Sequence, residues 1–247
     1  MNLFYSALIA TVLVIGLGIS LVVPVFFEGQ AEAKKQVVML SFSIDDQENL
    51  PTWCSDLNSL LLAEELRGTI FVTGRVADEY PNCVAALSSN PRLDIGTQTY
   101  DNAPLDSTID YSEMLLEVQR GKEAVDKAGS IESRVFKAPL GKTDENIYSL
   151  LNRSSILADF TYATYYTQFD GEHYIWFNVT SYDGSNTPAD SVNRIESSDS
   201  PLVIDFDNRD PISIIKNFVS DLDRNKFALA NASDLTRLEL TVRERTE

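Results

Sequence analysis

Apolar positions along this chain of 247 residues fall into short β-rich runs separated by helix-like stretches. Short apolar runs bounded by turn residues predict strands, and apolar residues spaced three or four apart predict helices. The expected strands are 37–44, 68–73, 93–97, 134–138, 156–160, 174–179, 202–206 and 226–230. The expected helices are 56–66, 76–87 with a break near Pro81, 112–128 capped by Gly129, 144–152 and 212–222.

This alternation predicts one α/β domain with a parallel sheet, because parallel strands need crossover connections, which are usually helices. Seven or eight such units in about 210 residues fit a distorted (β/α) barrel of about seven units better than a doubly wound sheet. We expect a single domain over residues 36–247, preceded by a separate segment over residues 1–35. In such barrels the functional side chains lie just after the strands, at their carboxyl ends.

The N-terminal segment predicts one transmembrane helix. Leu3–Phe27 is a run of 25 residues without a charge, and as a helix it would span roughly 37 Å, enough for a hydrocarbon core of about 30 Å. Ala31-Glu32-Ala33 has the form of a cleavage site, so a cleaved signal peptide stays open.

Two signals disagree about the side of the membrane on which the domain lies. Lys34 and Lys35 favour the cytoplasmic side, although long domains translocate largely regardless of charge. Glycosylation sequons at Asn152, Asn178 and Asn231 favour the outside. We expect a single-pass membrane protein with an extracytoplasmic domain.

Charge and composition exclude several classes of function. The net charge is −17, and residues 36–247 carry all of it, because residues 1–35 hold two acids and two bases. Such a chain lacks the basic surface of a nucleic-acid binder. Two cysteines exclude a thiolate zinc cluster, and the single His173 excludes any site that needs two imidazoles. We expect His173 at a strand edge or in solvent.

Five motifs follow expected strands in order. They are SFSIDD at 41–46, TIFVTG at 69–74, IGTQTYDNAPL at 95–105, FKAPLG at 136–141 and LVIDFD at 202–207. In order and spacing they resemble the polysaccharide deacetylase family (NodB-homology domains, carbohydrate esterase family 4). The corresponding family motifs are TFDD, ATFFVTG, IGNHTYSHPxL, FRxPxG and an apolar strand ending in His-Asp. The resemblance covers roughly residues 37–235 and implies that family's fold.

The resemblance also implies a site. The family holds a divalent metal such as zinc with one Asp and two His, and a second Asp is the base toward the metal-bound water. An Arg orients the base, and a late His protonates the leaving amine. The matching positions here are Asp45 for the base, Asp46, Gln98 and Asn102 for the metal, Lys137 for the Arg and Phe206 for the late His. A slip of one residue would put Asp205 or Asp207 there instead. Leu140 and Asp183, near other strand ends, are candidate binding residues.

The substituted residues predict a degenerate site without a cofactor. Zinc favours imidazole or thiolate, whereas Gln98 and Asn102 offer neutral amide oxygens. Phe206 cannot donate a proton, and Lys137 cannot form the bidentate fork of an arginine. We therefore expect a glycan-binding or scaffold role at the cell envelope.

Two alternatives stay open. The oxygen donors Asp45, Asp46, Gln98, Asp101 and Asn102 could hold Ca²⁺ or Mg²⁺ in an active deacetylase that hydrolyses the amide of N-acetylated sugars. A purely structural envelope protein is the other, since a fold does not fix a function. Cys54 and Cys83 fall in neighbouring units, so they form either a disulfide, if the domain is outside, or two buried thiols.

Overall fold

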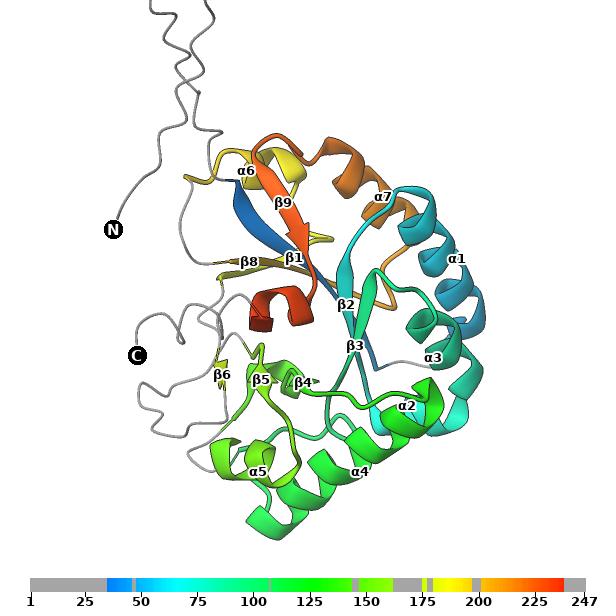
Figure 1. Ribbon diagram of the computed structural model, residues 1–247, viewed down its shortest axis with the longest axis vertical. Helices are drawn as coiled ribbons and strands as arrows, with labels where there is room; N and C mark the ends of the chain where they lie inside the picture. The colour runs from blue at the N-terminus through cyan, green and yellow to red at the C-terminus, as the bar shows by residue number, and fades with distance from the viewer. Residues whose placement is uncertain are drawn as a thin grey trace, which may run out of the picture. The chain divides into compact units, whose positions relative to one another are not determined.

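The strands build one parallel sheet. The computed structural model describes residues 35–45, 48–106, 108–143, 147–161, 175–176, 180–196 and 201–237. The strands in this part of the chain, shown in Figure 1, are β1 (Gln36–Ile44), β2 (Gly68–Val72), β3 (Leu93–Thr97), β4 (Val135–Phe136), β5 (Ala158–Asp159), β6 (Ile175–Trp176), β7 (Thr180–Asp183), β8 (Leu202–Asp207) and β9 (Phe227–Ala230). From Lys35 onward the chain forms one compact unit.

The sheet order is β6-β5-β4-β3-β2-β1-β8-β7, and β9 also pairs with β1. The central strand β1 is occupied on both edges. One edge pairs with β8 over residues 38–43, and the other pairs with β9 over 36–39 and with β2 over 41–44. The two ends of the order, β6 and β7, are separated along the chain only by residues 177–179. This parallel α/β arrangement is consistent with the expected (β/α) barrel.

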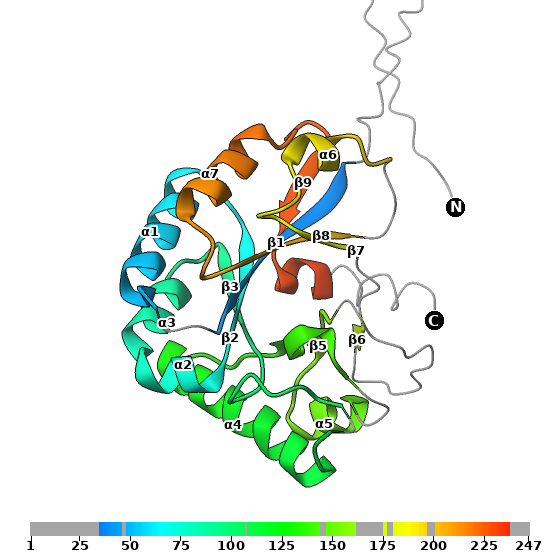
Figure 2. The same cartoon turned by 180° about the vertical axis from the view of Figure 1, so that it is seen from behind.

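Helices connect the strands. They are α1 (Leu50–Ala63), α2 (Gly74–Glu79), α3 (Pro81–Ser88), α4 (Tyr111–Gly129), α5 (Ile147–Arg153), α6 (Ala189–Asn193) and α7 (Ile212–Asp221), with a 3₁₀ turn η1 (Pro139–Gly141). Helices α7, α1, α3, α2 and α4 follow one another along one side of the sheet (Figures 1 and 2). The helical segment 232–237 lies on the opposite side.

Each strand divides its side chains between two faces, as the period of two requires. On β1, Val38, Leu40, Phe42 and Ile44 are fully buried in the core that contacts the helices. Met39 points the other way, into a second core that includes Ala232 and Leu235 of the C-terminal helical segment. The inner face therefore begins apolar at the amino ends of the strands.

The inner face becomes polar toward the carboxyl ends of the strands. On β1, Met39 is followed at alternate positions by Ser41, Ser43 and Asp45, and the last two line a pocket. On β8, Val203 is followed by Asp205 and Asp207 in the same way. The change from apolar to polar residues places the candidate chemistry at this end of the sheet.

Several element boundaries differ from the expectation. Helix α1 begins at Leu50, six residues before the expected start, because Pro51 is tolerated in a first turn and Leu50, Trp53 and Cys54 extend the buried face. Helix α4 extends through Gly129, and the left-handed residue that follows it is Ser130, at φ 51°. The break at Pro81 is confirmed by the separate helices α2 and α3.

Strand β7 and helix α6 were not expected, and neither were the 3₁₀ turn η1 and the helical segment 232–237. Strand β7 has the sequence TSYD and no buried residue, so it lacks the apolar run that marks the other strands. Helix α6 has only five residues, too few to display a helical period. The segments of 134–138 and 174–179 that form strands are shorter than expected, at two residues each.

The predicted membrane helix over Leu3–Phe27 lies outside the described residues. Within the part of the chain that the structure describes, none of the helices has the length and apolar character to span a bilayer.

Candidate functional site

The polar strand ends surround a pocket of about 250 Å³. Its wall includes Ser43 and Asp45 at the end of β1, Gln98 and Asn102 after β3, Lys137 and Leu140 after β4, Asp183 and Ser185 at the end of β7, and Asp205, Asp207 and Arg209 from β8 and its following loop. Eight of these residues are ones that the sequence singled out, and they lie at the ends of five strands.

Lys137 is paired with Asp205. The side chains are 8% and 19% exposed, and the ammonium group forms an ion pair with the Asp205 carboxylate. Lys137 Nζ also donates to Ser41 Oγ at 3.2 Å, and Ser181 donates to the other Asp205 oxygen. The nitrogen lies 5.4 Å from the centre of the Phe71 ring. The residue in the Arg position is therefore engaged with β8.

Asp45 is held by the loops that follow β3 and β8. Its Oδ2 accepts a hydrogen bond from Asn102 Nδ2 at 3.1 Å, and its Oδ1 forms an ion pair with Arg209 at 3.5 Å. Its backbone N–H donates to Asn208 Oδ1 at 3.2 Å. With a side chain only 16% exposed, Asp45 is a largely buried carboxylate whose cation is an arginine from β8's loop.

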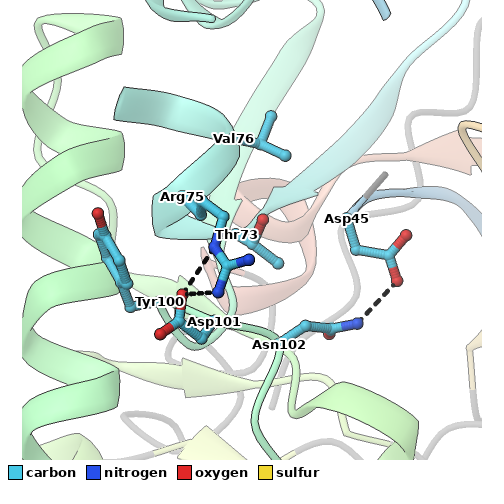
Figure 3. A pocket seen from close by; sticks show the side chains of 7 residues that line it. All are labelled: Asp45, Thr73, Arg75, Val76, Tyr100, Asp101 and Asn102. Atoms are coloured by element: carbon cyan, nitrogen blue, oxygen red, sulfur yellow. Dashed lines mark hydrogen bonds and ion pairs between the residues drawn. The ribbon is translucent and has the colours of Figure 1, made fainter. Parts of the chain in front are cut away.

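The two residues at the imidazole positions share the loop after β3. Gln98 is 3% exposed, and its amide nitrogen lies 3.5 Å from the carbonyl oxygen of Phe71. Asn102 has a φ of 59°, the left-handed region that asparagine tolerates better than most residues. In this conformation the side-chain amide of Asn102 points toward the Asp45 carboxylate (Figure 3).

Helix α4 holds this loop in place. The backbone N–H of Tyr100 donates to the carbonyl of Glu117 at 3.0 Å, and the N–H of Asp101 donates to the Glu117 carboxylate at 2.8 Å. A Cβ atom on Gly121 would lie 2.7 Å from the carbonyl oxygen of Gln98. Only glycine allows the helix to approach the loop backbone this closely.

A second pocket of about 300 Å³ adjoins the first and shares Asp45 and Asn102 with it. Figure 3 shows Arg75 paired with Asp101 on its far wall. The hydrogen bond to Asp101 raises the pKa of the Arg75 guanidinium above its ordinary value. Tyr100 lies beneath the Arg120 guanidinium, 3.8 Å from the ring centre. The Asp45–Asn102 contact separates the two pockets.

Asp183 and Leu140, the two candidate binding residues, both line the first pocket. Burial raises the pKa of Asp183, but hydrogen bonds from Asn186 and Ser185 outweigh it, so the pKa lies below its ordinary value. The Asp183 carboxylate therefore accepts its hydrogen bonds from the turn that follows it in the chain. Leu140 is 72% exposed at a φ of 55°, an unusual conformation for leucine.

Phe206 lies on the helix side of β8. It is 2% exposed, and its ring stacks on that of Phe42 with the centroids 5.8 Å apart. It also makes an edge-to-face contact with Phe218, with the ring centroids 5.6 Å apart. The inward neighbour Asp205 reaches Lys137 instead. The assignment of the late His position to Phe206 stays a prediction. The alternation of β8 buries the Phe206 ring in the helix-facing core and directs Asp205 and Asp207, the alternatives one residue away, toward the pocket.

The described donor set does not suit zinc. Carboxamides stand at both imidazole positions, and the Asn102 amide presents a hydrogen atom to Asp45. In the described ranges, no three His, Cys, Asp or Glu residues gather so as to hold a metal ion. Asp46, the expected metal carboxylate, and His173 lie outside those ranges.

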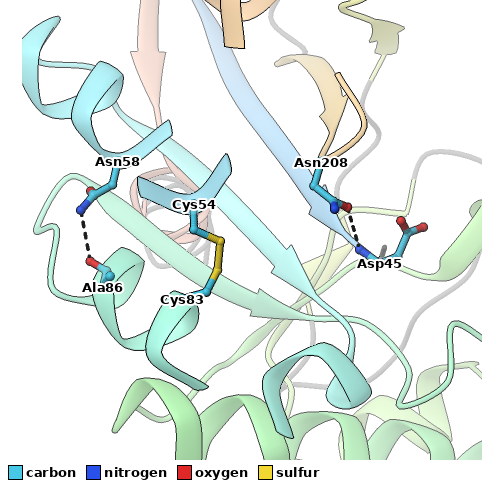
Figure 4. The surroundings of a disulfide bond; sticks show 6 residues. All are labelled: Asp45, Cys54, Asn58, Cys83, Ala86 and Asn208. Atoms are coloured by element: carbon cyan, nitrogen blue, oxygen red, sulfur yellow. Dashed lines mark hydrogen bonds between the residues drawn. A yellow bond between two sulfur atoms is a disulfide. The ribbon is translucent and has the colours of Figure 1, made fainter. Parts of the chain in front are cut away.

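A disulfide joins α1 to α3 near the site. Cys54 and Cys83, 29 residues apart, are bonded, with Cα atoms 5.7 Å apart (Figure 4). The sulfur atoms are buried in the helix-facing core. Beside them Asn58 donates to the carbonyl of Ala86, a second link between the same helices.

Sequence reasoning missed Arg209, Asn208, Ser41 and Ser181. Ser41 lies in the motif at 41–46 but received no role there, and the other three lie outside the five motifs. Each contributes a polar contact to Asp45, Lys137 or Asp205. The alternation of β8 was a signal that could have identified the inward-facing acids. Its apolar residues Leu202, Ile204 and Phe206 occupy one face. Asp205 and Asp207 therefore occupy the other face.

The sequence profile described as polysaccharide deacetylase matches residues 30–156, just over half of the chain. The chain therefore belongs to the polysaccharide deacetylase family. No curated protein matches it in sequence. The profile match ends before β8, so the assignments on that strand rest on the structure.

Solved structures share the fold. A Mycobacterium smegmatis protein assigned to the polysaccharide deacetylases is 16% identical over 86% of this chain and 92% of that one, with a TM-score of 0.68. The peptidoglycan deacetylase PdaC from Bacillus subtilis, as a mutant, is 13% identical over 86% and 95%, with a TM-score of 0.62. BA3943 from Bacillus anthracis, a CE4 family pseudoenzyme, is 13% identical over 82% and 66%, with a TM-score of 0.60.

Proposed function

We propose that this protein is a catalytically degenerate polysaccharide deacetylase that binds glycans at the envelope without a metal. The observation that carries the proposal is the state of Asp45 and Lys137. The base position is hydrogen-bonded to an amide where the family has an imidazole, and the residue at the Arg position is paired with Asp205. An imidazole-free site gives zinc weak ligands, and water without a metal is a poor nucleophile at neutral pH.

The two adjoining pockets support glycan binding. Volumes of about 250 and 300 Å³ with a shared wall suit successive rings of a linear sugar chain. The walls offer amides, hydroxyls and carboxylates for hydroxyl groups, and Leu140 offers an exposed apolar surface at the rim. Family membership makes a glycan the natural ligand class.

The test uses the full chain purified in mild detergent and an N-acetylglucosamine oligomer. We expect saturable binding of the oligomer and no acetate release, with or without added zinc. Leu140→Ala should weaken binding several-fold, whereas Leu116→Ala, which removes a similarly exposed leucine on α4, should leave it unchanged. Efficient zinc-dependent turnover would contradict the proposal, and the absence of any binding would favour a purely structural protein.

Restoration of the missing imidazoles tests the assignment of the metal positions. Gln98 and Asn102 are four residues apart, line one pocket and match the His-x-x-x-His spacing of the family. The double variant Gln98→His/Asn102→His should bind zinc and gain stability by about 2.7 kcal/mol at a hundredfold excess over the dissociation constant. A mutant of BA3943 is described as a pseudoenzyme with restored activity, which supports the strategy.

The readout is thermal unfolding of the double variant with and without zinc, with each single variant as a control. Because the late His is also missing, we expect zinc binding without turnover. The same melting temperature with and without zinc would show that the loop has left the family geometry.

An active enzyme with oxygen ligands is the second candidate. It is favoured by one observation: Asp45, Gln98 and Asn102 line the same pocket. Against it, Asp101 is paired with Arg75. Acetate release that depends on Ca²⁺ or Mg²⁺ would establish this candidate.

We further propose that Leu3–Phe27 anchors the protein and that the domain is extracytoplasmic. The Cys54–Cys83 disulfide supports this placement, because disulfides persist mainly in oxidising compartments. Protease added to intact cells should digest the domain, and Leu13→Arg/Ile15→Arg should release the protein from membranes. A domain that is protected until the cells are lysed would reverse the orientation.

A further inference from the structure

Arg209 lies between two carboxylates at the mouth of the first pocket. Its Nη2 atom is 3.5 Å from Asp45 Oδ1 and 3.0 Å from Asp207 Oδ2. Its Nε atom donates to Asp207 Oδ1 at 3.1 Å, so the contact with Asp207 is bidentate. One positive group is thus shared by an acid at the end of β1 and an acid at the end of β8.

The loop that carries Arg209 is fastened to the sheet. The backbone N–H of Asn208 donates to the carbonyl of Ser43 at 3.0 Å, and Asn208 Oδ1 accepts from the N–H of Asp45 at 3.2 Å. The N–H of Asp207 donates to Asp210 Oδ2 at 2.9 Å. Arg209 therefore extends from a fixed turn, although its side chain is 59% exposed.

The charge balance of the pocket depends on this residue. Five carboxylates line the pocket: Asp45, Asp183, Asp205, Asp207 and Asp210. Lys137 and Arg209 are the cations among its described lining residues, and Lys137 is engaged with Asp205. The positive charge next to Asp45 and Asp207 is therefore that of Arg209.

We propose that Arg209 is a built-in counter-ion that replaces a divalent cation beside Asp45 and makes the pocket independent of metals. Asp45 Oδ2 accepts a hydrogen bond from Asn102. Asp45 Oδ1 is buried without a hydrogen-bond partner in the described part of the chain, and its charge is balanced by the Arg209 guanidinium at 3.5 Å. A cation that bound between Asp45 and Asp207 would have to displace the guanidinium or lie against it, and like charges repel. The inference deepens the proposed function, since it explains how the same pocket keeps its carboxylates without a metal.

The experiment compares Ca²⁺ binding by calorimetry for the full chain and three variants, without any glycan. Calcium is the probe because the local donors are all oxygens. Arg209→Gln removes the charge and should bind Ca²⁺ at least tenfold more tightly than the wild type, with a Ca²⁺-dependent rise in melting temperature. Arg209→Lys keeps a charge and should behave as the wild type.

The matched control is Arg75→Gln. Arg75 is 52% exposed and makes a comparable ion pair with Asp101 on the neighbouring pocket. It should not gain Ca²⁺ affinity, because Arg75 forms its ion pair with Asp101, whereas Arg209 bridges the two carboxylates of Asp45 and Asp207. Equal Ca²⁺ binding by the wild type and Arg209→Gln, or no binding by either, would overturn the inference. Glycan binding is measured separately, so its absence would count against the proposed function alone.

Discussion

Lys137 is a buried lysine, and its contacts define a polar layer inside the sheet. Lys137 forms an ion pair with Asp205 and donates a hydrogen bond to Ser41, and Ser181 donates to the second carboxylate oxygen of Asp205. Such a pair is costly to desolvate, and either partner alone would be costlier still. The pair therefore acts as a unit, and its two members should respond to mutation together.

Replacement of both members should destabilise the protein less than the sum of the two single replacements. Lys137→Met leaves the Asp205 carboxylate unpaired and should lower the free energy of unfolding by about 3 kcal/mol. Lys137→Met/Asp205→Asn should cost clearly less than the two single changes added together. Urea unfolding of the four proteins forms a double-mutant cycle, and additive effects would mean that the pair is not coupled.

Replacement of Leu140 by glycine should change the stability of the protein in the opposite direction to the same replacement of an ordinary helical leucine. A left-handed leucine costs about 1–2 kcal/mol, which glycine avoids, whereas glycine costs about 0.5–1 kcal/mol in chain entropy. Leu140→Gly should therefore be neutral or stabilising by up to about 1 kcal/mol. Leu62→Gly, at a half-exposed position inside α1, should destabilise by about 1 kcal/mol. Chemical denaturation measures both, and a clear loss of stability in Leu140→Gly would show that the rim packs differently.

At the scale of elements, α4 determines where the loop after β3 lies. Glu117 accepts two backbone N–H groups of this loop, and Gly121 lets the loop backbone approach the helix. Gln98 and Asn102 therefore depend on a helix that contributes no residue to the first pocket.

Gly121→Ala should disturb the site through this contact. The new Cβ would lie 2.7 Å from the carbonyl oxygen of Gln98 and 2.9 Å from the carbonyl carbon of Thr99, so the backbone must shift. We expect a loss of about 1–3 kcal/mol in stability and weaker glycan binding. Gly129→Ala on the same helix meets side-chain atoms instead of backbone, Ile131 Cγ1 at 3.1 Å and Ser88 Cβ at 3.5 Å, and should be neutral or mildly stabilising. Equal effects of the two changes on stability would argue against a specific clamp at Gly121.

The sequence predicted the strands that carry strong apolar alternation and the helices that carry a clear period. It could not predict β7, whose TSYD residues have no buried face, or Arg209, whose role depends on how a loop folds back to Asp45. The positions of Gln98, Asn102 and Lys137 at one pocket were predictable from motif order. The partner of Lys137 was not, because it lies 68 residues further along the chain.

At the scale of the whole molecule, the disulfide links two helices that cover the same side of the sheet. Cys54 and Cys83 lie in α1 and α3, which also contact each other through Asn58 and Ala86. The covalent link shortens the unfolded chain and thereby favours the folded state.

Cys54→Ser/Cys83→Ser should lower the free energy of unfolding by about 3–4 kcal/mol, as the chain-entropy model predicts for a loop of about 30 residues. Thermal unfolding of the double variant beside the wild type measures the loss. The native disulfide should also resist reductant until the protein unfolds, because its cysteines are only 2% and 7% exposed. Rapid labelling of both thiols in the folded, reductant-treated protein would contradict that burial.

The double pairing of β1 also affects the order of events during synthesis. This strand emerges first, at residues 36–44, but its β8 edge and half of its other edge wait for residues 202–230. At about 5–20 residues per second, a ribosome needs roughly 10–40 s to produce those partners. For that time an apolar strand has an open edge, which exposes the nascent chain to misassociation and gives chaperones a target. If the domain is translocated as proposed, the same delay is useful, because the domain cannot close before its last strand has been made.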